Sequence, residues 1–162
     1  MPVISGGRVV QPGQVLQQEV TFTEVVGNNA AGTYTGSVTV PAGAYLVDVI
    51  LHGVAVWNSG SAVDMKVGDV ADDNGIFTGI DLKATDLLAA EGLAASGVGG
   101  SSGSEAGADL ANSQWSRRWL ATERIISGIV TCSGASGTTG VTRMVVIYTD
   151  PATPAAAVFA AS

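Results

Sequence analysis

Apolar and polar residues alternate along most of this chain in short runs, and Gly, Asn and Asp separate the runs. This pattern, together with many β-branched residues, predicts strands at 19–26, 34–40, 44–57, 61–69, 75–82, 124–134 and 142–149. Many short strands punctuated by turn residues are typical of antiparallel sandwiches. We therefore predict an all-β or mainly β single domain, an antiparallel β-sandwich or jelly-roll-like fold with extended terminal arms.

Helical spacing occurs in two places, so at most one or two short helices are predicted. In ATDLLAAEGLAA (84–95), Thr85 or Asp86 would cap the first turn. In AGADLANSQWSRRWLATE (106–123), Asp109 would be the cap, and the two tryptophans lie four residues apart.

The longest apolar run, 44–57, contains the one histidine of the chain, His52, four residues after Asp48. Both faces of a strand with this sequence are mostly apolar, as expected in the middle of a packed structure. Asp48 and His52 share a face but are about 13 Å apart along a strand that rises about 3.3 Å per residue. They cannot form a catalytic pair within the strand, and His52 is interpreted as a core or interface residue. Gly53 is the expected position of a β-bulge.

Composition divides the 162 residues into a domain and two arms. We predict an N-terminal docking arm at 1–18, a β-sandwich domain at 19–150 and a C-terminal tail at 151–162. Within the domain, the Gly/Ser-rich stretch 92–108 reads as a mobile surface loop. Fraying is the simpler alternative for the ends. A docking arm is favoured because a free tail would rarely carry so many apolar side chains, here Val3, Ile4, Val9 and Val10.

Charged residues make up only 13% of the chain, against about 25% in ordinary domains, and there are 22 glycines. This favours a β-rich protein that covers part of its surface by assembly over a plain β domain. The net charge of −7 argues against binding nucleic acid or an anionic membrane. Acidic residues dominate 64–91 and arginines dominate 115–143. These segments could meet within the fold or across a subunit interface, and we expect the first.

Candidate chemistry is sparse. Cys132 stands alone and is predicted to be a small buried thiol. The start of the chain does not resemble a signal peptide, and no apolar run is as long as a membrane span. GGSSG matches G-x-S-x-G around Ser101, but it lies in the Gly/Ser loop, and the histidine precedes the serine. We therefore predict no enzyme activity and no cofactor.

A weaker hypothesis concerns calcium. Asp69, Asp72, Asp73 and Asn74 gather oxygen ligands before Gly75. Their spacing differs from the EF-hand pattern, and Asp, Asn and Gly favour a turn without any metal. A turn is the preferred interpretation.

Aromatic and basic residues lie together at WSRRW. Trp115, Arg117, Arg118 and Trp119 could stack on a base or a sugar. A protein interface is preferred because Trp and Arg are enriched there. The interface residues predicted from the whole sequence are Val3, Ile4, Val9, Val10, Trp115, Arg118 and Trp119.

Three segments together resemble small virion proteins of tailed bacteriophages that decorate or cement the head. They are VPAGAYLVDVILHGVAVWN, KVGDVADDNGIFTGIDLKATDLLA and LATERIISGIVTCSGASGTTGVTRMVVIYTD. The likeness covers roughly 36–150, and it carries no residue-level functional motif.

The resemblance implies a β-rich, usually trimeric protein on the capsid exterior. It would be made in the cytoplasm of a bacterial host and would stabilise the shell by bridging neighbouring capsomers. The implied partners are the major capsid protein and further copies of this chain. The alternative is a virion fibre or spike component, or another β-sandwich binding module, that recognises a glycan or host surface.

Overall fold

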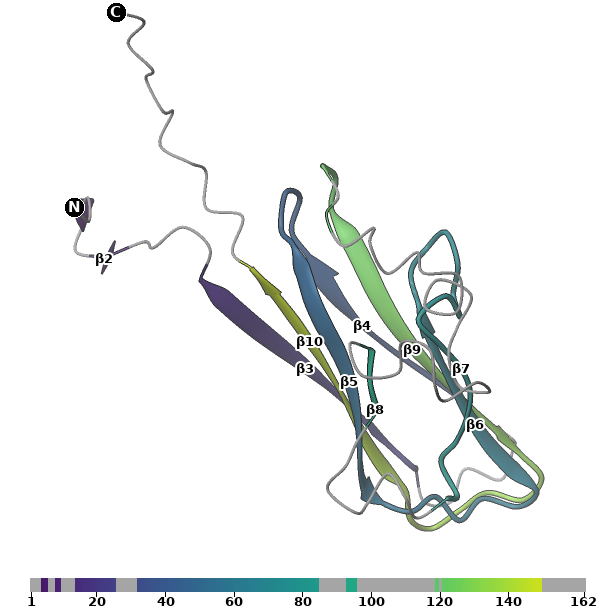
Figure 1. The fold of residues 1–162 in the computed structure, drawn as a ribbon. Helices are drawn as coiled ribbons and strands as arrows, with labels where there is room; N and C mark the ends of the chain where they lie inside the picture. Colours follow the sequence, from purple (N-terminus) through teal and green to yellow (C-terminus); the bar gives the residue numbers. More distant parts are fainter. Residues whose placement is uncertain are drawn as a thin grey trace, which may run out of the picture.

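Two four-stranded antiparallel sheets face each other in the computed structural model of the chain (Figure 1). The structure describes residues 4–5, 8–9, 14–25, 32–84, 93–95, 119 and 121–149. Near the N-terminus, β1 (Ile4–Ser5) and β2 (Arg8–Val9) form a separate two-stranded pair. No helix of the described residues is long and apolar enough to cross a membrane.

The sheets have the same number of strands but different edges. The first has the order β3 (Val15–Thr23), β10 (Val141–Thr149), β5 (Leu46–Ala55) and β8 (Leu93–Ala94). The second has the order β4 (Thr33–Val40), β9 (Arg124–Ser133), β6 (Ala62–Gly68) and β7 (Phe77–Asp81).

The chain passes repeatedly from one sheet to the other, because β3, β5, β8 and β10 belong to the first sheet and the strands between them to the second. This exchange of strands between two four-stranded sheets is a jelly-roll-like topology. The predicted all-β sandwich is confirmed, and every predicted strand has a counterpart. The first strand of the sandwich begins at Val15, four residues before the predicted start of the domain, because 15–18 pair with 146–149 of β10.

Helices were expected at 84–95 and 106–123, and both segments lie largely outside the described residues. Two of the described pieces, Leu93–Ala94 and Trp119, are extended. Leu93–Ala94 form β8, which pairs with Leu51 and Ile50 of β5, and Ala95 is buried. Trp119 forms an isolated antiparallel bridge with Tyr45. The prediction that 92–108 is a mobile surface loop is therefore wrong at 93–94, where pairing to a core strand outweighs the Gly/Ser-rich context.

The core fills the space between the sheets. Its largest fully buried side chains come from both layers. They are Trp57, Phe77, Leu46, Leu51, Met65, Ile76, Ile80, Ile126 and Met144, with Val49, Val63 and Val67.

The two sheets approach closely on the side formed by β3 and β4. Gly36 and Gly128 are cross-strand partners in β4 and β9, and both face Phe22 of β3. A Cβ at Gly128 would lie 2.7 Å from Cζ of Phe22 and 2.8 Å from Cε of Met65. Real Cβ atoms do not approach other atoms so closely, so the glycine pair is what lets the phenylalanine ring lie between the sheets.

The strand β5 is central, as predicted, but its alternation is broken twice. Its pairing with β10 shifts between the Leu46–Tyr148 and Asp48–Ile147 pairs, and again between Gly53–Thr142 and Ala55–Val141. The first shift makes Leu46 point inward together with Val49 and Leu51. The second lies at the bulge position expected near Gly53.

Candidate functional site

The two ends of the sandwich differ in what they expose. We call the end where β3 begins and β10 ends the terminal end; it also holds the loops 41–45 and 69–76 and Trp119. We call the opposite end, formed by Glu24 and the loops 56–61 and 134–140, the closed end. Of the six large hydrophobic side chains that are exposed among the described residues, four lie at the terminal end: Val15, Tyr45, Val70 and Trp119.

Tyr45 and Trp119 are held side by side by backbone contacts. The Trp119 indole Nε1–H donates to the carbonyl of Gly43 at 3.1 Å. Gly43 has a positive φ of 78°, which suits glycine in the turn that follows β4. The Tyr45 N–H donates to Thr149 Oγ1 at 3.0 Å, and the Thr149 N–H donates to the Tyr45 carbonyl at 2.8 Å. The Trp119 indole and the Tyr45 backbone are therefore held in place, while 43% of Tyr45 and 56% of Trp119 remain exposed.

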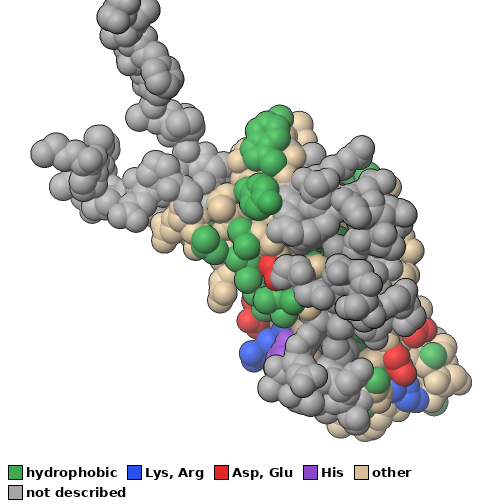
Figure 2. All heavy atoms as spheres, viewed as in Figure 1, with side chains coloured by type: hydrophobic (Ala, Val, Ile, Leu, Met, Phe, Trp, Pro, Cys, Tyr) green, Lys and Arg blue, Asp and Glu red, His purple; other side chains and the backbone are tan. Residues whose placement is uncertain are grey.

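Hydrophobic side chains continue from this end over the outer face of the first sheet. Figure 2 shows them as a green strip that runs down the upper part of the molecule. On this face Ile50 of β5 lies opposite Val145 of β10, and Ile147 lies opposite Asp48, all of them half-buried. Lower on the same face, His52 lies opposite Arg143, whose Nε is 3.2 Å from Glu19 Oε1.

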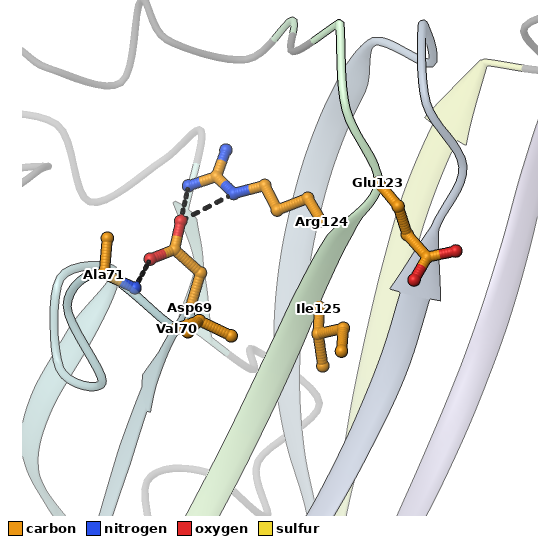
Figure 3. Close-up of a pocket in the computed structure, with 6 residues that line it drawn as sticks. All are labelled: Asp69, Val70, Ala71, Glu123, Arg124 and Ile125. Carbon is orange, nitrogen blue, oxygen red and sulfur yellow. Dashed lines mark hydrogen bonds and ion pairs between the residues drawn. The ribbon is translucent and has the colours of Figure 1, made fainter.

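An ion pair fastens the loop 69–76 to the start of β9. Nη2 and Nε of Arg124 each lie 2.8 Å from Oδ2 of Asp69 (Figure 3). Only 11% of the arginine side chain and 15% of the aspartate side chain are exposed. Charge-assisted, forked contacts of this kind are among the stronger hydrogen bonds in proteins. The acidic segment 64–91 and the arginine-rich segment 115–143 thus do meet within the fold.

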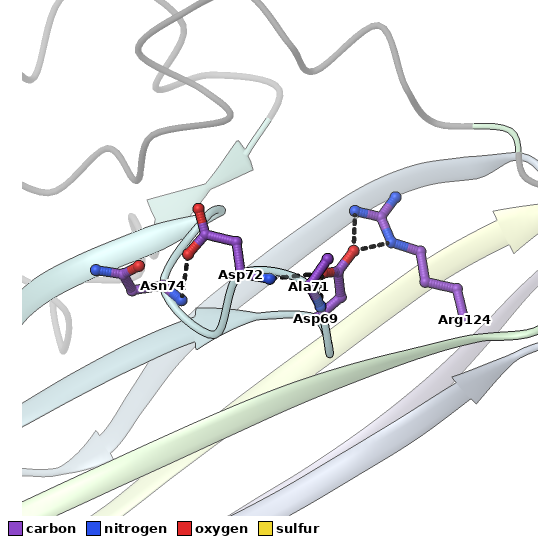
Figure 4. A network of polar contacts seen from close by, with 5 residues as sticks. All are labelled: Asp69, Ala71, Asp72, Asn74 and Arg124. Carbon is purple, nitrogen blue, oxygen red and sulfur yellow. Dashed lines mark hydrogen bonds and ion pairs between the residues drawn. The ribbon is translucent and has the colours of Figure 1, made fainter.

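Further hydrogen bonds hold the same loop in shape (Figure 4). Oδ1 of Asp69 accepts from the N–H groups of Ala71 at 2.9 Å and Asp72 at 3.1 Å. Oδ1 of Asp72 accepts from the Asn74 N–H at 3.3 Å, and Asp73 pairs with Lys66 at 2.5 Å. The loop is a braced turn, and it presents Val70 with 85% of its surface exposed.

The four residues of the calcium hypothesis, Asp69, Asp72, Asp73 and Asn74, all lie in this loop. The carboxylates of Asp69, Asp72 and Asp73 each accept hydrogen bonds from donors of the chain itself. Among the described residues, no group of three or more His, Cys, Asp or Glu side chains could hold a metal ion. The preferred interpretation as a turn matches the observed loop.

A small open hollow lies between this loop and β9. It has a volume of about 330 Å³. In Figure 3 the Arg124 side chain points towards Asp69, whereas the Glu123 side chain points away from that pair. The hollow is lined by Asp69, Val70, Ala71, Glu123, Arg124 and Ile125.

The closed end contains a buried carboxylate, Glu24. It accepts hydrogen bonds from Ser59 Oγ at 2.6 Å and from the Tyr34 hydroxyl at 3.0 Å, and only 6% of the residue is exposed. The Tyr34 ring meets the Trp57 ring edge-on with centroids 5.5 Å apart, and Trp57 Nε1 donates to Thr142 Oγ1 at 3.0 Å. The polar groups therefore have partners inside the protein, as buried polar groups require.

Cys132 lies beside this carboxylate, with its Sγ 3.7 Å from Oε2 of Glu24. Burial raises the pKa of the Cys132 thiol above its ordinary value of 9.0; the hydrogen bond with Ser59 lowers it, and the charge of Glu24 raises it further. A thiol that stays protonated is a poor nucleophile. The prediction of a buried, unreactive cysteine agrees with this position.

Asp48 and His52 do not form a pair. The Asp48 carboxylate accepts from the N–H of Val49 at 2.8 Å, and His52 lies opposite Arg143 on the neighbouring strand. Ser101 lies outside the described residues.

The predicted interface residues are only partly described. Ile4 and Val9 are register partners in β1 and β2, and Trp119 is exposed at the terminal end. Val3, Val10, Trp115, Arg117 and Arg118 lie outside the described residues. Sequence analysis missed Val15, Tyr45 and Val70. A signal for Tyr45 was present in the turn residues Pro41 and Gly43, which place it at the end of a strand.

No protein-family model and no curated protein sequence matches this chain. Its fold is similar to that of a chain in the solved structure described as the Cyanophage Pam1 capsid asymmetric unit. The TM-score is 0.54 and the sequence identity is 14%, and the match covers 91% of this chain and 92% of that one.

A second structure, the acidic stable capsid structure of Helicobacter pylori bacteriophage KHP30, contains a chain matched with a TM-score of 0.46. The sequence identity is 16%, with 84% of this chain and 94% of that chain covered. The resemblance to phage head proteins found in the sequence is thus confirmed at the level of the fold by the first of these structures.

Proposed function

We propose that this chain is a structural virion protein that binds the outside of a phage capsid and stabilises it by bridging neighbouring capsomers. In this proposal its partners are the major capsid protein and further copies of itself, arranged as a homotrimer. It is not an enzyme. A protein that binds the assembled shell and not its separated subunits stabilises the shell by mass action.

The observation that carries the proposal is the gathering of exposed apolar side chains at the terminal end. Val70 lies on a braced loop, Trp119 is hydrogen-bonded to the turn at Gly43, and Val15 and Tyr45 both adjoin Thr149 of β10. Exposed apolar groups on a rigid support cost little entropy when they bind a partner. Both terminal segments continue from this end, because Val15 and Thr149 are partners in the β3–β10 register. The fold likeness to a chain of a phage capsid supports the same role.

The first experiment counts copies of this chain by quantitative mass spectrometry of particles from the source virus. Hundreds of copies, in a simple ratio to the major shell protein, are expected because symmetric shells offer symmetric binding sites. A dozen copies or fewer would support the alternative of a fibre or spike component. Absence from the particles would overturn the virion assignment.

A second experiment measures docking to particles that lack this protein. Deleting residues 1–10 should weaken binding without lowering the unfolding temperature, because the two sheets do not include these residues. Val70→Asp should weaken binding as well, and Val54→Asp is a matched control, since Val54 is exposed away from the terminal end. Unchanged binding by both altered proteins would show that this end is not the docking site.

A further inference from the structure

The four edge strands of the two sheets are protected to very different degrees. β8 has two residues, and β7 has five residues, a register shift and the charged Asp81. β3 is long but carries Glu19, which is paired with Arg143. β4 has eight residues, all in unbroken register with β9, and contains no charge and no proline. Short length, charges, prolines and bulges are the usual means of protecting an edge.

The outer face of β4 is accessible to solvent. Thr33, Thr35, Ser37 and Thr39 alternate along its outer face and are exposed. Within the part of the chain that the structure describes, β9 is the one strand that pairs with β4. A long, flat, uncharged edge of this kind is a template for an added strand.

We propose that β4 accepts the C-terminal segment of a neighbouring copy, residues 155–162, as an additional antiparallel strand. This inference deepens the homo-oligomeric part of the proposed function and rests on it. It names the surface through which copies of the chain associate.

The sequence of that segment fits the edge. AAAVFAAS has eight residues, as β4 does, with no charge and no proline. Apart from Val158 and Phe159, its side chains are those of Ala and Ser and need little room beside the Thr and Ser face of β4. The N-terminal segment fits less well, because it carries Arg8 and its strands β1 and β2 already pair with each other.

The direction of the chain fits too. β10 ends at Thr149, which is hydrogen-bonded to Tyr45, five residues after the end of β4. When the terminal ends of two copies lie side by side, a segment that starts at this end of one copy and follows the β4 edge of the other runs antiparallel to β4, as all neighbouring strands of the two sheets do.

A neighbouring copy is favoured over the same copy. Within one copy, the segment would have to turn around β3, which lies outside β10 in the first sheet. The connecting residues 150–154 include Pro151 and Pro154, whose fixed φ favours an extended path over a tight return. Donation from each copy to the next is a head-to-tail contact, and a threefold arrangement closes it into a ring.

The test mixes two variants that each carry one introduced cysteine besides the buried native Cys132. One copy carries Thr35→Cys on β4, and the other carries Ala157→Cys, Val158→Cys or Phe159→Cys. Under mild oxidation we expect a reducible species of twice the chain mass with at least one of the three, because adjacent strands bring Cα atoms within disulfide range. Thr23→Cys, exposed on the protected β3 edge, replaces Thr35→Cys as the matched control and should give little of this species. Equal cross-linking of both, or none with Thr35→Cys, would overturn the inference.

A truncation gives an independent measurement. Removal of residues 151–162 should convert the oligomer to a monomer in light scattering, with the unfolding temperature of each β-sandwich retained. An oligomer that keeps its number of copies after the truncation would also overturn the inference. So would a full-length chain that is itself monomeric. Neither result would affect the copy count in particles, so capsid binding and strand donation can fail separately.

Discussion

The closed end of the sandwich buries its large aromatic side chain, whereas the terminal end leaves its aromatic side chains exposed. At the closed end, Trp57 is 1% exposed, and Glu24 finds its hydrogen-bond partners inside the protein. At the terminal end, Tyr45 and Trp119 are anchored through backbone contacts while their rings stay in solvent. A protein that needed both ends only for folding would have little reason to leave two large aromatic rings exposed at one end.

This difference implies a division of roles that can be tested. Changes at the closed end should lower the free energy of unfolding and affect capsid docking only through loss of the folded protein. Changes of exposed side chains at the terminal end should weaken docking and leave the unfolding free energy nearly unchanged.

The largest effect is expected for Trp57→Ala. The change removes a buried ring, its hydrogen bond to Thr142 and its edge-on contact with Tyr34. Truncation of a buried aromatic side chain costs about 3–5 kcal/mol. Urea unfolding followed by far-UV circular dichroism measures this loss. A loss below about 1 kcal/mol would contradict the view that this end supports the fold.

Trp119→Ala is the counterpart at the terminal end. Exposed tryptophans at the centre of an interface can contribute about 2 kcal/mol or more to binding, which is roughly a 30-fold change in Kd. The unfolding free energy should change by less than about 1 kcal/mol, since the ring is already 56% exposed. Co-sedimentation with particles that lack this protein measures the change in Kd. A stability loss as large as that of Trp57→Ala would remove the distinction between the two ends.

Much of the fold follows from local sequence pattern. Alternation and β-branched residues located the long strands, and Pro41 and Gly43 marked the turn after β4. Pattern could not locate β8, because two residues in a Gly/Ser-rich stretch become a strand only through pairing with β5. It also could not place Leu46 inward, since that depends on a register shift against Ile147 and Tyr148.

The candidate site was less predictable than the fold. Trp119 was identified because Trp and Arg cluster around it, but Val70 is one valine among many, and its exposure depends on the contacts that brace its loop. The Asp69–Arg124 pair joins residues 55 positions apart. The segregation of charge indicated that such a pair would form, and only the fold determines which residues make it.

Glu24→Gln should have an intermediate effect at the closed end. The amide keeps the size of the side chain, but it replaces one acceptor oxygen with a donor that faces Ser59 or Tyr34. Leaving buried hydrogen-bonding groups unsatisfied costs about 1–3 kcal/mol. Urea unfolding measures the loss, and Glu19→Gln, on the exposed face of β3, is the matched control. Equal losses for both variants would show that burial of Glu24 is not the cause.

The two ion pairs of the terminal end, Asp69–Arg124 and Lys66–Asp73, should contribute different amounts to the free energy of unfolding. Asp69→Asn removes the carboxylate charge that pairs with the largely buried Arg124 and should cost about 1–3 kcal/mol, because bonds to charged groups are worth more than neutral ones. Lys66→Ala breaks a pair whose side chains are 37% and 56% exposed, and should cost less than about 1 kcal/mol. Thermal unfolding of both variants shows which of the two losses of stability is larger. A reversed order would mean that the Asp69 contact does not brace the loop.

Calcium should produce the smallest effect of all. Asp69, Asp72 and Asp73 already accept hydrogen bonds from Ala71, Asn74 and Lys66, so a bound ion would have to displace donors that the fold supplies. The unfolding temperature of the full-length protein should therefore be the same in millimolar calcium and in a chelator. The Asp69→Asn variant is the matched control, because it removes one oxygen ligand without changing the size of the side chain. A calcium-dependent rise in unfolding temperature that disappears in this variant would show that the loop binds the ion, and it would favour a binding module over a protein that only stabilises a shell.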